Sequence, residues 1–150
     1  MKIHLFTLFI GFIALSCQKE PTACILIEPG TTVTVFDNVT LTSCSEDAHY
    51  LNWEIEEFQN GNQVFQVDIA ASVNFIWDDA GTFDIYLTAS SENLKKEDFA
   101  SAQVTVEDVC YKCTNGANDS DICYSDYEGK SVFEAALANF ESAGFTCTLK

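Results

Sequence analysis

The chain has 150 residues and carries 23 Asp and Glu against seven Lys, with no Arg, for a formal net charge of −16 at pH 7. This balance excludes nucleic-acid binding, which depends on cations that neutralise phosphates, and it opposes contact of the domain with an anionic lipid surface. The length suits one domain of ordinary size, or one small domain with an appendage.

The N-terminus has the three parts of a secretory signal. Lys2 supplies positive charge, residues 5–15 form an apolar run, and a small residue, Ser16, precedes Cys17. The run is shorter than the roughly 20 residues that a membrane span needs. This stretch resembles a lipobox, which implies that residues 1–16 are a lipoprotein signal peptide and that Cys17 is lipidated. The alternative is an ordinary cleaved signal with an incidental cysteine.

Residues 17–23 are interpreted as a lipidated linker. Gln18, Lys19 and Glu20 follow Cys17 directly and are similar to the short export tag of Bacteroidetes-type surface lipoproteins, which combines lysine with acidic residues. The resemblance implies a lipid-anchored protein of the outer membrane, exposed at the cell surface. The alternative is a solvated spacer between lipid and domain, and both interpretations can hold together.

From residue 24 to 107 the sequence alternates between apolar and polar side chains, which is typical of short strands. Examples are Phe83, Ile85 and Leu87, which are separated by polar or partly polar residues, and turn signals such as Pro29-Gly30 lie between such runs. No helical period occurs here. Many strands with one buried face and near-even spacing predict a β-sandwich.

Residues 108–150 have a different pattern, which predicts a small hairpin-plus-helix appendage. Two short strands, at 109–114 and 121–124, flank a turn-rich stretch. Ser131 is predicted to cap a helix with Glu134 as its capping-box partner, and Gly144 to end it. So small a unit buries little apolar area and needs covalent staples.

Six cysteines remain besides Cys17, an even number in an exported chain, which predicts three disulfides. We expect Cys24 to pair with Cys44. Cys110 and Cys113 point to opposite faces of a strand, so one should bond Cys123 across the hairpin and the other Cys147, in an order left open. A zinc site at this C-x-x-C pair lacks a second ligand pair, and a redox site would open a helix rather than a strand.

Two blocks of sequence together resemble the PKD (polycystic-kidney-disease-type) domain, an Ig-like sandwich. The first is residues 29–45 with the Tyr50-to-Ile55 strand and its core Trp53; the second is residues 76–89 with 104–106, in which Gly81 and Phe83 match the family's aromatic–glycine pattern. The resemblance covers residues 24–107. The family's tight glycine turn after the Trp strand is missing, which predicts a longer, differently shaped loop there.

The inventory of reactive groups predicts no catalytic site, no metal site and no cofactor. The chain after Cys17 has a single His, His49, and no Gly-x-Ser-x-Gly elbow. Asp78 and Asp79 are a possible calcium pair, but the spacing of a calcium loop is absent. Trp53 and Trp77 are expected in the core, whereas Tyr50, Tyr86 and Phe65 are the aromatic residues better placed for exposure.

The chain is therefore predicted to be a non-catalytic binding or interaction module for protein or glycan. The candidate contacts are Asn60 and Asn62 in one polar connection, and Lys95 and Lys96 in another, at 91–98. The alternative is a structural spacer or accessory subunit of an outer-membrane complex. A contiguous apolar or aromatic patch on one side of the sandwich would favour the binding module.

Overall fold

The computed structural model describes residues 19–59 and 62–150. Residues 1–16, Cys17 and Asn60 lie outside this range. The described chain is mainly β with one α-helix near the C-terminus, which confirms the predicted fold class. No helix within it is long and apolar enough to cross a membrane.

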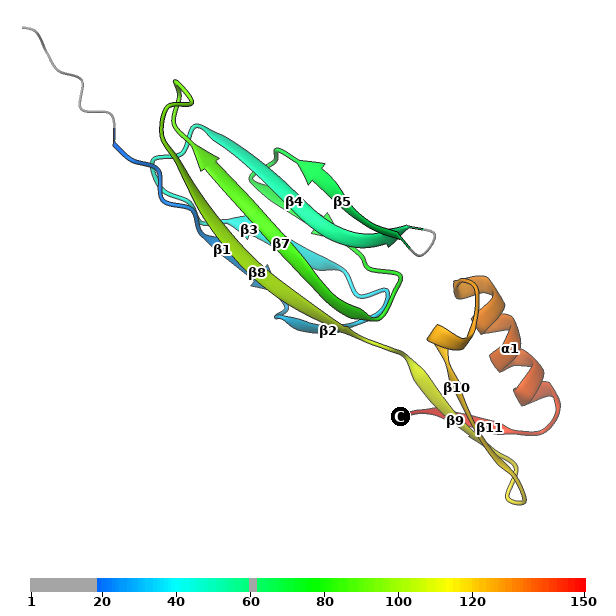
Figure 1. The fold of residues 1–150 in the computed structure, drawn as a ribbon. Helices are drawn as coiled ribbons and strands as arrows, with labels where there is room; N and C mark the ends of the chain where they lie inside the picture. The colour runs from blue at the N-terminus through cyan, green and yellow to red at the C-terminus, as the bar shows by residue number, and fades with distance from the viewer. Residues whose placement is uncertain (1–18, 60–61) are drawn as a thin grey trace, which may run out of the picture.

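The larger part of the chain is a two-sheet sandwich (Figure 1). The five-stranded sheet has the order β2-β8-β7-β4-β5, with β2 at Thr32–Thr34, β8 at Glu97–Glu107, β7 at Gly81–Ser90, β4 at Tyr50–Gln59 and β5 at Asn62–Asp68. The three-stranded sheet has the order β1-β3-β6, with β1 at Ile25–Glu28, β3 at Val39–Ser43 and β6 at Ser72–Phe75. All neighbouring strands are antiparallel except β2 and β8.

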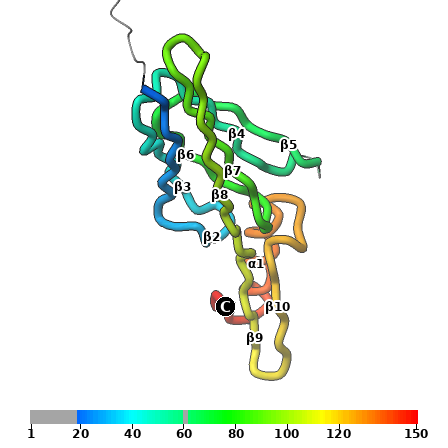
Figure 2. The backbone as a smooth tube through the Cα atoms, turned by 60° about the vertical axis from the view of Figure 1, so that its left-hand side comes forward, coloured from blue at the N-terminus to red at the C-terminus, as the bar shows by residue number. Residues whose placement is uncertain are grey.

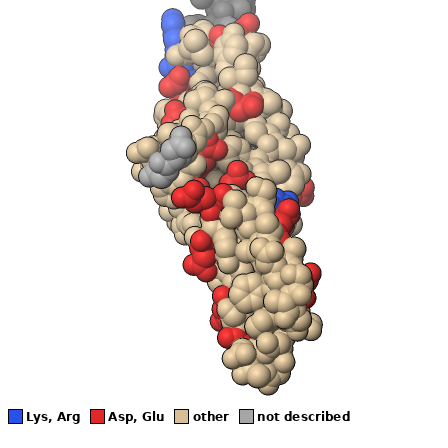
Figure 3. All heavy atoms as spheres, turned by 90° about the vertical axis from the view of Figure 1, so that its right-hand side faces the viewer, with Lys and Arg blue, Asp and Glu red and all other residues tan. Residues whose placement is uncertain are grey.

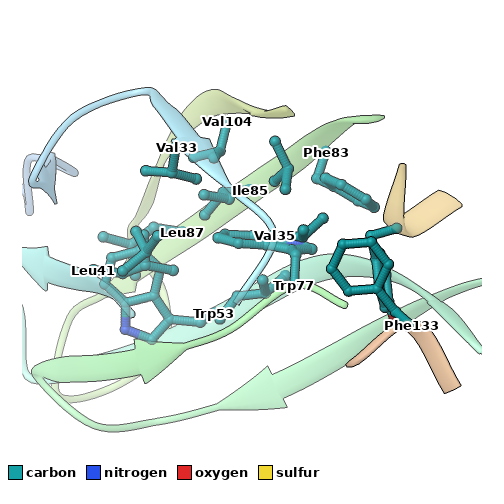
Figure 4. Packing of buried hydrophobic residues seen from close by; sticks show 14 of the residues in the cluster. Val33, Val35, Leu41, Trp53, Trp77, Phe83, Ile85, Leu87, Val104 and Phe133 are labelled. Atoms are coloured by element: carbon teal, nitrogen blue, oxygen red, sulfur yellow. The ribbon is translucent and has the colours of Figure 1, made fainter. Parts of the chain in front are cut away.

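The inward side chains of both sheets form the core (Figure 4). Trp53 and Trp77 are both buried, as predicted, and each indole N–H donates to a backbone carbonyl: Trp53 to Ala70 at 2.9 Å and Trp77 to Glu56 at 2.8 Å. These bonds satisfy the polar atom that each large apolar side chain brings into the interior.

We predicted a longer loop after the Trp53 strand, where the family's glycine turn is missing, and this prediction was wrong. β4 continues to Gln59, which pairs with Asn62, so only residues 60 and 61 separate β4 from β5. Buried Glu56 supports this extension, because its carboxylate accepts hydrogen bonds from the Asp84 backbone N–H at 2.7 Å and from the side chain of Gln63. The carboxylate thus links β4 to β7 just beyond the last backbone pair of these strands.

The C-terminal part is a second three-stranded sheet with one helix beside it (Figure 2). Its order is β10-β9-β11, with β9 at Cys110–Thr114, β10 at Asp119–Cys123 and β11 at Thr146–Leu149; a 3₁₀ turn at Tyr124–Asp126 precedes α1 at Lys130–Ser142. The disulfides expected from the cysteine count are present. Their pairs are Cys24–Cys44, Cys110–Cys123 and Cys113–Cys147.

Two details of this part differ from the sequence prediction. Gly129, not Ser131, is the N-cap of α1, and no side chain caps the helix, so the predicted capping box with Glu134 was wrong. Gly129 has a φ of 99°, a conformation that glycine adopts without steric cost and serine does not. Strand β11 was not predicted; it places Cys147 directly opposite Cys113 on β9.

The hairpin and α1 join the sandwich at the end of β8, and the N-terminal segment leaves the other end (Figure 1). The ring of Phe36 meets Tyr124 edge-on at 4.7 Å, and the Lys130 ammonium lies 4.7 Å from the centre of the same ring. The buried side chains form one continuous cluster from the sandwich to Phe133 of α1. The two parts are therefore packed together, not merely linked.

Candidate functional site

The structure places the predicted contact residues at opposite ends of β4. Asn62 begins β5, next to the end of β4. The 91–98 connection instead follows the end of β7, where Ser90 pairs with Tyr50 at the start of β4. These two connections therefore cannot form one binding site.

The two lysines of the 91–98 segment have local interactions. Lys96 Nζ lies 3.3 Å from a carboxylate oxygen of Glu20, and the Lys95 backbone N–H donates to Asn93 Oδ1 at 3.1 Å. Strand β8 begins at Glu97, so the connection is shorter than the 91–98 range predicted from the sequence.

Among the described residues, Asp78 and Asp79 do not belong to a group of three ligand-type side chains close enough together to share a metal ion. Asp78, Asp79 and Asp108 lie near Tyr124, where burial and then these three carboxylates raise the pKa of the phenol. The ligand-type side chains that do converge are Asp108, Cys110 and Cys123, and the two cysteines are joined in a disulfide, which removes their thiolates.

The outward face of the five-stranded sheet carries several exposed aromatic rings: Tyr50 at the start of β4, which is 48% exposed, and three others that follow one diagonal. Phe65 on β5 is 44% exposed, Tyr86 on β7 is 40% exposed, and Phe99 on β8 is 68% exposed. Their inward neighbours, such as Ile85 on β7, are buried in the core. Alternation along each strand therefore directs these rings to solvent on one face, and we call the three residues the aromatic strip.

Strand register sets the path of the aromatic strip. Tyr86 pairs with Ser101 on one side and with Glu54 on the other; Phe99 lies two residues from Ser101, and Phe65 faces Glu56, two residues from Glu54. Relative to Tyr86, Phe99 is shifted by two residues along the strand direction one way and Phe65 by two residues the other way, so the three rings lie on a diagonal across the strands. With ordinary strand spacing and rise, this diagonal is about 20 Å long. The centroids of Phe65 and Tyr86 are 6.1 Å apart.

Hydrogen-bonding side chains lie beside the diagonal, next to Tyr86. The Tyr86 hydroxyl donates to Asp84 Oδ2 at 3.2 Å, and Gln103 Nε2 donates to Asp84 Oδ1 at 2.7 Å. The hydrogen bond to Asp84, followed by the negative charge of Asp84 and then of Glu56 and Glu54, raises the pKa of the Tyr86 phenol. This face thus combines apolar rings with a linked set of donors and acceptors and carries negative charge.

Sequence reasoning identified part of this face. Tyr50, Tyr86 and Phe65 are exposed as expected, because each occupies an outward position in an alternating strand. Phe99 was missed because it directly follows the 91–98 segment, which was interpreted as a polar connection. The available signal was the alternation of Phe99, Ser101 and Gln103 with small or apolar residues, which extends β8 back to Glu97.

No protein-family model matches the chain, and no curated protein matches it. One solved structure, described as "Structural basis for the promiscuous specificity of the carbohydrate-binding modules from the beta-sandwich super family", aligns with a TM-score of 0.46 and 14% identity. The alignment covers 65% of this chain and 45% of that one, so this chain matches less than half of that protein's length.

Proposed function

We propose that this protein is a lipid-anchored cell-surface module that binds an uncharged glycan through the aromatic strip. The observation that carries the proposal is the diagonal of Phe65, Tyr86 and Phe99 on one open sheet face, with polar side chains beside the diagonal. Sugar rings present flat C–H surfaces that pack on aromatic faces, and their hydroxyl groups pair with carboxylates and amides at the edges.

The charges on this face favour a glycan over a protein as the ligand. Glu54 and Asp84 flank Tyr86, and buried Glu56 lies beside them. The centre of a protein interface is depleted of charged residues, because desolvating an unpaired carboxylate is costly. A carbohydrate hydroxyl can donate a hydrogen bond to each carboxylate instead. The same carboxylates repel an anionic glycan, so the preferred ligand is neutral.

An exposed aromatic strip also favours a binding module over the alternative of a spacer, because a spacer has no use for large apolar side chains in water. Lipidation at Cys17 and a place on the outer membrane belong to the same proposal. They are supported by the signal-like residues 1–16 and the tag-like residues after Cys17. The PKD-type relationship is likewise proposed, on the Trp53 strand and the Gly81 to Leu87 block within a two-sheet sandwich.

The test is a neutral-glycan array probed with soluble protein starting at residue 18, followed by calorimetry on the best ligand. Tyr86→Ala, Phe65→Ala and Phe99→Ala should each weaken binding by about tenfold, the loss expected for one aromatic contact of about 1.4 kcal/mol. Leu26→Ala is the matched control, because Leu26 is an exposed apolar residue on the other sheet.

Binding that is lost in the three ring variants and retained in Leu26→Ala supports the proposal. Absence of binding to any glycan, or equal losses in the control, would contradict it. Asp84→Asn separates the roles of the rings and the carboxylates: it keeps an acceptor for Gln103, so neutral-glycan binding should change little while repulsion of acidic glycans falls.

A further inference from the structure

The three-stranded sheet ends in an edge strand that no other strand covers within residues 19–59 and 62–150. β6 pairs with β3 on one side only. In Ig-type sandwiches of the constant class the corresponding sheet has four strands. Here the chain passes from β5 to β6 through residues 69–71 alone, so no strand of this connection covers the edge of β6.

Backbone groups of β6 face outward along this edge. The Ser43 N–H donates to the Ala71 carbonyl at 2.9 Å, which places the backbone groups of Ala71 and of alternate residues after it against β3. In an antiparallel ladder the intervening residues direct their N–H and C=O groups to the other side. Ser72 and Asn74 therefore present backbone donors and acceptors at the free edge.

A groove with an apolar floor opens beside this edge. Its volume is about 400 Å³, and it lies between β6 and the outer edge of β5, where the two sheets separate. Val73 and Phe75 line it from β6, and Ile55 lines it from β4. Beside the groove, Ile69 is 77% exposed. An added strand could thus pair with the edge and bury alternate side chains in the groove.

Both edge strands lack two common protections against such pairing, although β6 is short, with four residues. Natural edges are guarded by lysine, proline or bulges, but β5 and β6 contain neither lysine nor proline. The charged residues that line the groove are Glu57 and Asp68, both acidic. Figure 3 shows the side of the molecule on which β4 ends and β5 begins. Most of the charged side chains on this side are Asp or Glu.

We infer that β6 and this groove form a docking site for an extended, basic segment of a partner protein, which pairs with β6 as a fourth strand. Backbone pairing holds the segment, alternate apolar side chains enter the groove, and a lysine or arginine lies beside Asp68 and Glu57. Charge selects this occupant over a second copy of the chain, because each copy carries a net charge of −16. The site is centred on β6, in the other sheet from the aromatic strip, and does not depend on glycan binding.

The test measures fluorescence anisotropy of a short labelled peptide in which valine alternates with lysine, titrated with soluble protein from residue 18. The decisive variant is Asn74→Pro. Proline removes an N–H that faces the free edge and leaves the β3 ladder intact, so the fold should survive while peptide affinity falls at least about tenfold.

Thr40→Ala is the matched control. The Thr40 hydroxyl donates to Asn74 Oδ1 at 2.9 Å, a bond that the proline variant also loses. Thr40→Ala should therefore retain peptide binding. Asp68→Asn keeps an acceptor for the Ala70 N–H but removes the charge, so it should weaken the lysine peptide and leave a glutamine version of the peptide unchanged.

Amide exchange gives a site-specific measurement that does not rely on variants. In the complex, the Ser72 and Asn74 amides should gain protection, because added strand pairing covers them. No saturable binding by the unaltered protein, or unchanged binding in a folded Asn74→Pro variant, would overturn the inference. Concentration-dependent dimers that Asn74→Pro abolishes would overturn it too, in favour of self-association.

Discussion

Phe36 should hold the C-terminal part of the chain against the sandwich, and Phe36→Ala tests this. The ring of Phe36 is half-buried. Its centroid lies 4.7 Å from the centroid of the Tyr124 ring and 4.7 Å from the Lys130 ammonium. Truncation of a fully buried Phe costs about 3–5 kcal/mol, and a half-buried ring should lose about half of that. With loss of the cation–π contact, about 0.5–1 kcal/mol, the free energy of unfolding should fall by about 2–3.5 kcal/mol.

The backbone at this position adds a second, opposite prediction. Phe36 has a φ of 71°, in the left-handed region that disfavours side chains with a Cβ atom by about 1–2 kcal/mol. Phe36→Gly loses the same ring but relieves this strain. It should therefore be about 1 kcal/mol more stable than Phe36→Ala, although glycine is smaller and more flexible when unfolded.

Urea unfolding with two probes measures both effects. The two tryptophans, Trp53 and Trp77, lie in the sandwich, so indole fluorescence follows that part. Amide signals of α1 follow the C-terminal part. The two transitions should coincide in the unaltered protein and separate in Phe36→Ala. Phe99→Ala, an exposed Phe away from the junction, should cost less than about 0.5 kcal/mol.

If Phe36→Ala lowers the free energy of unfolding by less than about 0.5 kcal/mol, or if its two transitions still coincide, the inferred role of the Phe36 contact is refuted. An alanine variant at least as stable as the glycine variant would refute the strain argument separately.

Three further outcomes are expected. Asp84→Asn should lower the pKa of Tyr86 toward its ordinary value, which spectrophotometric titration can follow. A hydrogen bond with the Thr114 hydroxyl, and then the interaction with Lys112, lower the pKa of Asp119. The ionised carboxylate therefore stabilises the fold above about pH 4, and this stabilisation is lost as pH falls through the folded-state pKa. In Asp119→Asn the urea midpoint should depend less steeply on pH in this acidic range. Cys17→Ala should leave unprocessed precursor that takes up no labelled fatty acid; normal processing would count against lipidation.

Local alternation was sufficient to predict most of the sandwich strands. Phe83, Ile85 and Leu87 are fully buried on one face of β7, as a period of two requires. The same rule placed Tyr86 and Phe65 outside. It failed at Phe99, where a polar, lysine-containing stretch before the strand concealed the first residues of β8.

Non-local pairing set the limits of prediction in the C-terminal part. The short strand β11 has mostly exposed side chains and forms because it pairs with β9, which lies more than 30 residues earlier in the chain. That pairing also decides the disulfides, because it brings Cys147 opposite Cys113 and leaves Cys110 opposite Cys123. Cysteine spacing alone could not select between the two arrangements.

The two proposed surfaces are centred on different sheets and meet only along β5, so most of their variants should act independently. The aromatic strip lies on the outer face of the five-stranded sheet, whereas the docking edge is β6 of the other sheet. Val67 is the residue common to both: it pairs with Glu54 beside the strip, lines the groove and is 64% exposed. Changes at Tyr86 and Asn74 should therefore be additive, and any coupling between glycan and peptide should disappear in Val67→Ala.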